Sequence, residues 1–209
     1  MSFGFFIENI FMLKIGITGG IGSGKTIVSK IFETLGIPVF DADTAAKKVM
    51  NEDEHLKNEL QKEFGNEVYT NGKLNRKYLA DIVFNDVYQL EKLNALVHPA
   101  AIKMAVQWAS QQTSPYVIKE AALMFEAGSG LNIDYVIGVS APQHLRIQRA
   151  MERDNISRED VLARMNRQID EDIKMRLCDF VIVNDEQQLM IPQVLKLHER
   201  FLQLAKLKL

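Results

Sequence analysis

Short apolar segments alternate with amphipathic stretches along most of this chain, a pattern typical of a parallel sheet flanked by helices. Five segments are expected to form buried strands, at residues 13–18, 37–40, 116–118, 135–139 and 180–183. Val28, Ile31, Phe32 and Leu35 recur at helical spacing after the first of them, and residues 189–207 predict a long amphipathic helix at the end. The pattern therefore predicts an α/β fold with five parallel strands.

One long stretch, residues 52–112, departs from this alternation. It contains no segment that favours a strand, and Leu56, Leu60 and Phe64 lie on one helical face. Further helices are expected at residues 76–84, 87–97 and 99–108, with Pro99 near the start of the last and a turn at Asn71-Gly72. This stretch exceeds an ordinary crossover, so we expect an inserted helical subdomain that binds a second substrate.

The first strand runs into GGIGSGKT, which matches the P-loop pattern with Gly19, Gly24, Lys25 and Thr26 at the fixed places. A strand, a glycine-rich turn and a helix aim successive backbone N–H groups at one point, which favours phosphate. An accidental glycine-rich turn is the alternative, but the flanking strand and helix favour a nucleotide site. The expected ATP-binding residues are Gly20, Ile21, Gly22, Ser23, Gly24, Lys25 and Thr26, with Lys25 on the β- and γ-phosphates and the Thr26 hydroxyl on Mg²⁺.

Acidic residues follow two other predicted strands. Asp41 and Asp43 come after the second strand and Glu120 after the third, and the carboxyl ends of parallel strands are where ligands gather. Asp43 is the expected base that meets an acceptor hydroxyl, while one of the two aspartates could instead cap a helix at residues 44–50. Glu120 is expected either near Mg²⁺ or as an exposed charge at the strand end.

Six of the nine arginines lie between residues 146 and 167, a window without lysine. They are Arg146, Arg149, Arg153, Arg158, Arg164 and Arg167. Planar guanidinium groups stabilise the charge that develops on a transferring phosphoryl group. A break at residues 155–157 predicts two short helices, and we expect a lid that closes over the phosphates. One or two of these arginines are expected on phosphate, and the others in local ion pairs.

Composition limits the remaining possibilities. The 209 residues carry a net charge of −2, which argues against a nucleic-acid surface as the main function. The single cysteine, Cys178, favours a reducing compartment, so we expect a cytoplasmic protein, and no apolar run approaches the ~20 residues of a membrane span. Residues 1–11 are expected to be an N-terminal extension that activity does not need, before a single kinase domain at residues 12–209.

The ordered set of motifs resembles the dephospho-coenzyme A kinase family from Lys14 to about Asn184. GITGGIGSGKT, VFDADTAAKKV, GKLNRKYLADIVFND and LNALVHP are similar to its P-loop, strand-end and substrate-side segments. EAALMFE stands where the family usually has a Pro-Leu-Leu-Phe-Glu run, with Ala122 in place of the proline. RIQRAMERDNISREDVLARMNRQ and QIDEDIKMRLCDFVIVN resemble the lid and the closing segment.

The resemblance implies a P-loop kinase with an inserted helical subdomain at about 52–112 and a lid at about 142–176. It implies that Asp43 is the base at the 3′-hydroxyl of dephospho-coenzyme A, with Lys25 and Arg149 also catalytic. The residues implied on the acceptor side are Asp43, Arg76, His98, Leu123 and Glu126, and those on the ATP side include Arg146, Arg149 and Asn184, the last near the adenine. From the sequence alone, a single histidine such as His98 is more often structural than catalytic, and Leu123 could be either a core residue or an apolar wall for a substrate.

The expected substrates are therefore ATP and dephospho-coenzyme A, with Mg²⁺ and without an obligate protein partner. A kinase for another nucleoside or nucleotide is the nearest alternative. A P-loop binding switch usually needs a base-reading motif such as N-K-x-D, which this sequence lacks. A simple ATPase would not need an arginine-rich lid that closes over a second substrate.

Overall fold

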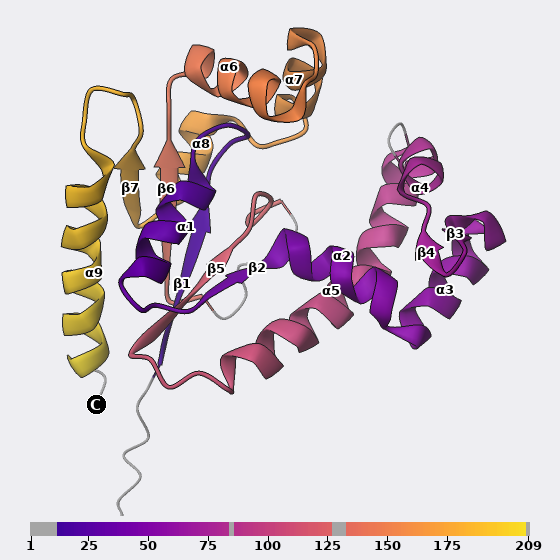
Figure 1. Cartoon of the computed structure of the whole chain (residues 1–209), viewed down its shortest axis with the longest axis horizontal. Helices are drawn as coiled ribbons and strands as arrows, with labels where there is room; N and C mark the ends of the chain where they lie inside the picture. Colours follow the sequence, from indigo (N-terminus) through magenta and orange to yellow (C-terminus); the bar gives the residue numbers. More distant parts are fainter. Residues whose placement is uncertain (1–11, 84–85, 127–132, 208–209) are drawn as a thin grey trace, which may run out of the picture.

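The computed structural model of the protein describes residues 12–83, 86–126 and 133–207. The five expected strands form one parallel sheet in the order β2-β5-β1-β6-β7, which confirms the predicted fold class (Figure 1). Their bounds are β1 Leu13–Thr18, β2 Val39–Asp41, β5 Tyr116–Glu120, β6 Tyr135–Ser140 and β7 Phe180–Val183. Because all five run in the same direction, their carboxyl ends meet at one edge of the sheet, where the predicted site residues follow.

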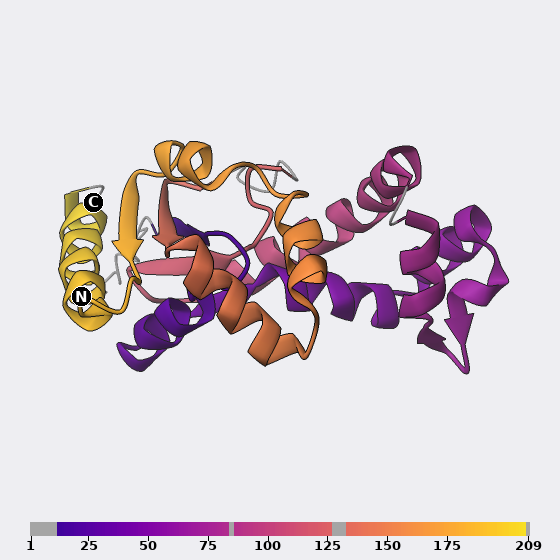
Figure 2. The same cartoon turned by 90° about the horizontal axis from the view of Figure 1, so that it is seen from above.

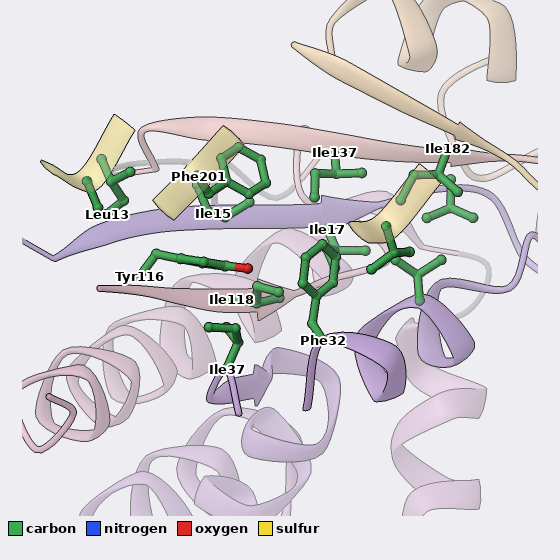
Figure 3. Close-up of a cluster of buried hydrophobic side chains, with 14 residues drawn as sticks. Leu13, Ile15, Ile17, Phe32, Ile37, Tyr116, Ile118, Ile137, Ile182 and Phe201 are labelled. Atoms are coloured by element: carbon green, nitrogen blue, oxygen red, sulfur yellow. The ribbon is translucent and has the colours of Figure 1, made fainter. Parts of the chain in front are cut away.

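The main hydrophobic core lies between one face of this sheet and two helices, α1 (Lys25–Thr34) and α9 (Met190–Leu207). Alternate residues of β1, such as Ile15 and Ile17, point into it and are fully buried, as Figure 3 shows. Phe32 of α1 and Phe201 of α9 pack from the helical side. The apolar residues at alternate strand positions and those at helical spacing thus pack into one core, as the sequence pattern predicts.

The opposite face of the sheet approaches its neighbours so closely that two strand positions are glycine. A Cβ on Gly16 would lie 2.5 Å from the sulfur of Met124, and one on Gly138 would lie 2.6 Å from that of Met175. Met175 belongs to a short helix, α8 (Glu171–Arg176). The two glycines therefore let the loop at residues 121–126, which contains Met124, and the helix α8 lie directly against the sheet.

A second cluster of elements extends away from the sheet, as Figure 2 shows from above. It comprises α2 (Ala42–Glu52), α3 (Glu54–Phe64), the 3₁₀ turn η1 (Asn66–Val68), β3 (Tyr69–Thr70), β4 (Lys73–Leu74), α4 (Arg76–Val83) and α5 (Val87–Ala109). These elements share a core of their own, built around the predicted inward positions Leu56, Leu60 and Phe64. The helical character expected for this stretch is confirmed.

Two details of this cluster differ from the prediction. No strand was expected here, but β3 and β4 form a two-stranded antiparallel hairpin closed by Asn71-Gly72, both at positive φ. A break was expected before Pro99, but α5 runs through it as one helix. Val97 of α5 is buried in the cluster core and α5 packs along α2, so tertiary packing outweighs the hydrogen bond that proline cannot make.

The arginine-bearing segment forms α6 (Gln143–Asp154) and α7 (Arg158–Met165), as expected, and α8 completes it. Asn155 adopts a left-handed conformation that ends α6, and Ser157 with Asp160 forms a capping box that starts α7. Residues 1–11 lie outside the described residues, so their expected dispensability stays a prediction. Within the described part of the chain, the helices are too short or too polar to span a membrane.

Candidate active site

The P-loop occupies the turn between β1 and α1, as its sequence predicts. Gly22 and Gly24 have φ values of 75° and 101°, which favour glycine. A Cβ on Gly22 would lie 2.2 Å from the backbone oxygen of Arg146, and one on Gly24 would lie 2.3 Å from the Asn184 amide nitrogen. No side chain caps the start of α1, so its first N–H groups and the positive end of its dipole are available to an anion.

The two polar residues that begin α1 face this loop. Lys25 Nζ donates hydrogen bonds to the backbone oxygens of Gly19, over 2.9 Å, and Gly20, over 3.3 Å. Burial lowers the pKa of Lys25, while the carboxylates of Glu120 and Asp43 act in the opposite direction. The ammonium group is thus held at the mouth of the loop, between the phosphate site and two carboxylates.

Thr26 Oγ1 donates a hydrogen bond to Glu120 Oε1 over 2.9 Å. Glu120 ends β5, so the structure brings the P-loop hydroxyl and the strand-end carboxylate together. Hydroxyl and carboxylate oxygens are the ligands that Mg²⁺ takes, together with water and phosphate oxygens. These residues therefore fit a divalent cation that binds with a nucleotide.

The two aspartates after β2 have different environments. Asp41 is the cap of α2, where its Oδ1 accepts from the N–H groups of Asp43 and Thr44, each over 3.0 Å. The Asp43 carboxylate instead lines a cavity and is available to a ligand, and the Ala122 backbone acts to lower its pKa. Burial and the charge of Asp41 raise the pKa of Asp43, while Lys25 acts in the opposite direction.

Asp43 lines a cavity of about 230 Å³ between the sheet edge and the helical cluster. His98 and Leu123, two residues expected on the acceptor side, line the same cavity, and Lys119 adds a cation. Burial and the charge of Lys119 lower the pKa of His98, so its imidazole is neutral at pH 7. The cavity is mostly apolar with a few convergent polar groups, which is typical of a small-molecule site.

The other two residues expected on the acceptor side lie elsewhere. Arg76 is the first residue of α4, and neither it nor Glu126 is among the residues that line this cavity. Glu126 Oε1 accepts from Lys174 Nζ, over 2.9 Å, and from the Ile169 N–H, over 3.0 Å. Their contacts with substrate stay predictions.

Two lid arginines lie close to the P-loop and the strand ends. Arg146 is buried, and its Nη1 is 2.9 Å from Glu171 Oε2, beside Gly20. Arg149 donates to the backbone oxygen of Asn184, over 3.3 Å, and to Glu186, over 2.8 Å. Arg153 and Arg164 form an exposed ion-pair group with Asp154 instead.

Comparison with known proteins now decides the family. A family model described as dephospho-CoA kinase matches residues 13–189. This chain belongs to the dephospho-CoA kinase family. Proteins of this family phosphorylate dephospho-coenzyme A in the final step of coenzyme A synthesis, so the resemblance predicted from the motifs is confirmed.

Several relatives match nearly the whole chain. It is 39% identical over 186 residues to the dephospho-CoA kinase of Bacteroides fragilis, covering 88% of this chain and 91% of the relative. The dephospho-CoA kinase of Porphyromonas gingivalis is 38% identical, with 90% and 94% covered. The solved dephospho-CoA kinase of Campylobacter jejuni is 26% identical with a TM-score of 0.64, covering 94% and 98% of the two chains. A Thermus thermophilus structure, TT1252, is 34% identical with a TM-score of 0.82, covering 90% of this chain and 97% of that one.

In this dephospho-CoA kinase family member, Asn184 connects the P-loop to the end of the neighbouring strand β6. Its amide donates to the backbone oxygen of Ser23 over 2.8 Å, and its own N–H donates to Ser140 over 2.8 Å. The expected adenine contact stays a prediction. The structure places Asn184 beside Gly24, where its side chain positions the phosphate-binding loop.

Three residues at the site were not among the predicted ones. Gln168 Oε1 accepts from the Ile21 N–H over 3.0 Å, Glu171 pairs with Arg146, and Lys174 pairs with Glu126. All three belong to the segment that ends the lid and forms α8. In the sequence these three residues appear only as polar side chains in the segment that ends the lid. That pattern does not identify the residues with which they pair.

Proposed function

We propose that this protein transfers the γ-phosphoryl group of ATP to the ribose 3′-hydroxyl of dephospho-coenzyme A. The observation that carries the proposal is that Asp43 both lines the apolar cavity and interacts with Lys25 of the P-loop. A hydroxyl bound in that cavity would meet a base on one side and a held phosphate on the other. In-line transfer needs this arrangement, because positioning and charge stabilisation supply most of the catalysis.

On the donor side, the backbone N–H groups of residues 20–26 would hold the β- and γ-phosphates. Lys25 would leave the Gly19 and Gly20 oxygens to reach these phosphates, since three donors on a flexible stem allow the exchange. Thr26 and Glu120 would hold a magnesium ion, which neutralises phosphate charge when it is bound with ATP. Kinases of this family use ATP, and such transfer generally needs a divalent metal.

On the acceptor side, Asp43 would orient the 3′-hydroxyl and accept its proton. Burial strengthens the carboxylate as a base by raising its pKa, and the loop that contains Ala121 and Leu123 lines the same cavity. His98 and Leu123 would contact the acceptor nucleotide in the cavity. Among the described residues Glu126 Oε2 is buried without a hydrogen-bond partner, which supports a ligand contact there, and Arg76 would meet the acceptor further out.

The lid would complete the phosphate site. Arg149 makes one long hydrogen bond and one exposed ion pair, so it can turn to the transferring group at little cost. Arg146 keeps its position beside Gly20 and has a buried Nε without a partner among the described residues, which supports a phosphate contact. Asn184, whose amide lies beside Gly24, would lie near the adenine.

This proposal divides a single kinase domain at residues 12–209 into a sheet core, an acceptor subdomain at about 52–112 and a lid at about 142–176. Residues 1–11 would be an extension outside it. We further propose that the protein acts in the cytoplasm on small-molecule substrates alone. The single cysteine and the modest net charge support this part of the proposal.

The test measures ADP release with ATP and Mg²⁺, with and without dephospho-coenzyme A, and detects coenzyme A by mass spectrometry. Asp43→Asn should lower kcat by about 10²-fold or more, since it removes a positioned base from the transition state. Asp53→Asn is the matched control, because Asp53 is an aspartate of the same helical cluster that caps α3 and does not line the cavity. ADP release that does not depend on the acceptor would indicate a simple ATPase, and an acceptor other than dephospho-coenzyme A would indicate another nucleotide kinase.

A further inference from the structure

Lys174 is a fully buried lysine, with 0% of its side chain exposed, on the short helix α8. Its Nζ lies 2.9 Å from Glu126 Oε1 and makes a longer contact, 3.4 Å, with the backbone oxygen of Ala122. Burying an ammonium group is costly unless several partners replace its water shell. Here both partners belong to one loop, residues 121–126, which follows β5.

That loop leads directly to the proposed base. Asp43 and the two neighbours of Ala122, Ala121 and Leu123, line the same cavity, while the carbonyl of Ala122 faces Lys174. The Ala122 backbone also lowers the pKa of Asp43, so this residue lies between a lysine and a carboxylate that are distant in the sequence. A displacement of Ala122 would change the orientation of Asp43 without touching Asp43 itself.

The same segment also contacts the donor side. Gln168 accepts from the Ile21 N–H of the P-loop, and Glu171 pairs with Arg146, whose guanidinium lies beside Gly20. The Ile169 N–H donates to the same Glu126 oxygen as Lys174. Residues 168–174 therefore connect the phosphate-binding loop to the loop that holds Asp43.

We propose that Lys174 is a positioning residue that, through Glu126 and Ala122, holds loop 121–126 and thereby sets the orientation of Asp43 toward the acceptor hydroxyl. This inference rests on the proposed function, because it concerns the geometry of the same phosphoryl transfer. It gives Lys174 no contact with substrate. The lysine acts through the loop, and its effect is on the catalytic step rather than on ATP binding.

A buried ion pair can also serve stability alone, and the two roles predict different results. Removing one partner of a buried pair leaves an uncompensated charge, whereas removing both leaves none. A pair that only stabilises the fold should therefore lose function in the single variants and regain it in the double variant. If Lys174 instead positions Ala122, the additional removal of Glu126 should not restore kcat.

The experiment compares Lys174→Met, Glu126→Gln and the double variant with the full-length wild-type protein. Melting temperature, kcat, and KM for ATP are measured for each with the coupled ADP assay. Lys92→Met is the matched control, because Lys92 pairs with Glu63 at the surface of the helical cluster. It should behave as the wild type does in all three measurements.

Lys174→Met should melt several degrees below the wild type, and the double variant should recover at least half of that loss. We expect kcat to be about 10- to 100-fold lower than in the wild type in both variants, as for a misplaced catalytic group. KM for ATP should stay within about threefold of the wild-type value. Recovery of kcat together with stability in the double variant would overturn the inference, as would a normal kcat in Lys174→Met. If the wild type makes no coenzyme A at all, the proposed function fails first and this inference with it.

Discussion

Replacing Arg146 by methionine should destabilise the protein mainly through the carboxylate that the arginine leaves behind. The Arg146 side chain is 8% exposed and that of Glu171 16%, and Nη1 and Oε2 are 2.9 Å apart. Methionine keeps much of the apolar stem but removes the charge, so Glu171 becomes a nearly buried carboxylate without its cation. The charges of Lys174 and Lys25 and the backbone of Gly20, which also lower the pKa of Glu171, remain.

The magnitude follows from the burial. Breaking a fully buried pair by removing one partner costs about 3–5 kcal/mol, and the partial exposure of Glu171 and the remaining charges of Lys174 and Lys25 lower this to about 2–4 kcal/mol. For a chain of this size the melting temperature should fall by about 4–16 °C. Urea denaturation followed by circular dichroism measures the loss of unfolding free energy.

The loss should depend on pH in a definite direction. Burial raises the pKa of Glu171 above its usual 4.5, and Arg146 is the largest effect that opposes the rise. Without Arg146 the pKa of Glu171 in the folded state rises further. The variant therefore loses the least unfolding free energy at a pH below the pKa of Glu171 in the unfolded state, where the carboxyl is protonated in both states. The deficit relative to the wild type should then grow as pH rises from the folded pKa of Glu171 in the wild type to its higher folded pKa in the variant, and stay constant above that.

Denaturation at pH 5 and at pH 7.5 therefore tests the reasoning, with Arg146→Met/Glu171→Gln as control. The double variant should recover much of the stability at pH 7.5, because no uncompensated charge remains. A loss below about 1 kcal/mol at pH 7.5, or an equal loss at both pH values, would show that Arg146 does not stabilise a buried Glu171 carboxylate.

Four further outcomes are expected. Gly24→Ala should weaken ATP binding at least ~10-fold in a fluorescent-analogue titration, because its Cβ would strike the Asn184 amide and its φ is 101°. Leu60→Ala should lower the unfolding free energy in urea by about 2–5 kcal/mol, since Leu60 is fully buried in the core of the helical cluster. Removing divalent cations with EDTA should abolish ADP release, and added Mg²⁺ should restore it. Deleting residues 1–11 should leave kcat/KM within about twofold of the full chain, because the described fold begins at β1.

The parallel sheet and the P-loop were predictable because the patterns that produce them are local. A strand such as β1 appears as one short apolar segment, and the P-loop depends on fixed spacing within eight residues. The hairpin at Asn71-Gly72 was missed as strands because β3 and β4 are only two residues each, too short to show an alternation. The continuation of α5 through Pro99 depends on packing against other helices, which no local pattern records.

Site residues were predictable only where they come directly after a predicted strand or helix in the sequence. Asp41 and Asp43 could be assigned to the end of β2, but the geometry separates them: the first caps α2 and the second faces the cavity. Glu120 remained undecided between two roles until the structure placed it against Thr26. In each case the sequence placed the residue at the correct edge, and a partner from elsewhere determined what its carboxylate does.

Residues of the closing segment were beyond sequence reasoning for a related physical reason. Gln168 meets Ile21 across a separation of 147 residues, and Lys174 meets Ala122 across 52. Lys174 also lies in a highly charged stretch, residues 170–176, where solvent exposure is the usual outcome for a lysine. It becomes buried because Gly138 lets α8 lie against the sheet, which places the ammonium group above the loop that holds Asp43. The absence of a side chain in one strand thus determines where a charge on another element lies, and that coupling exists only in the folded chain.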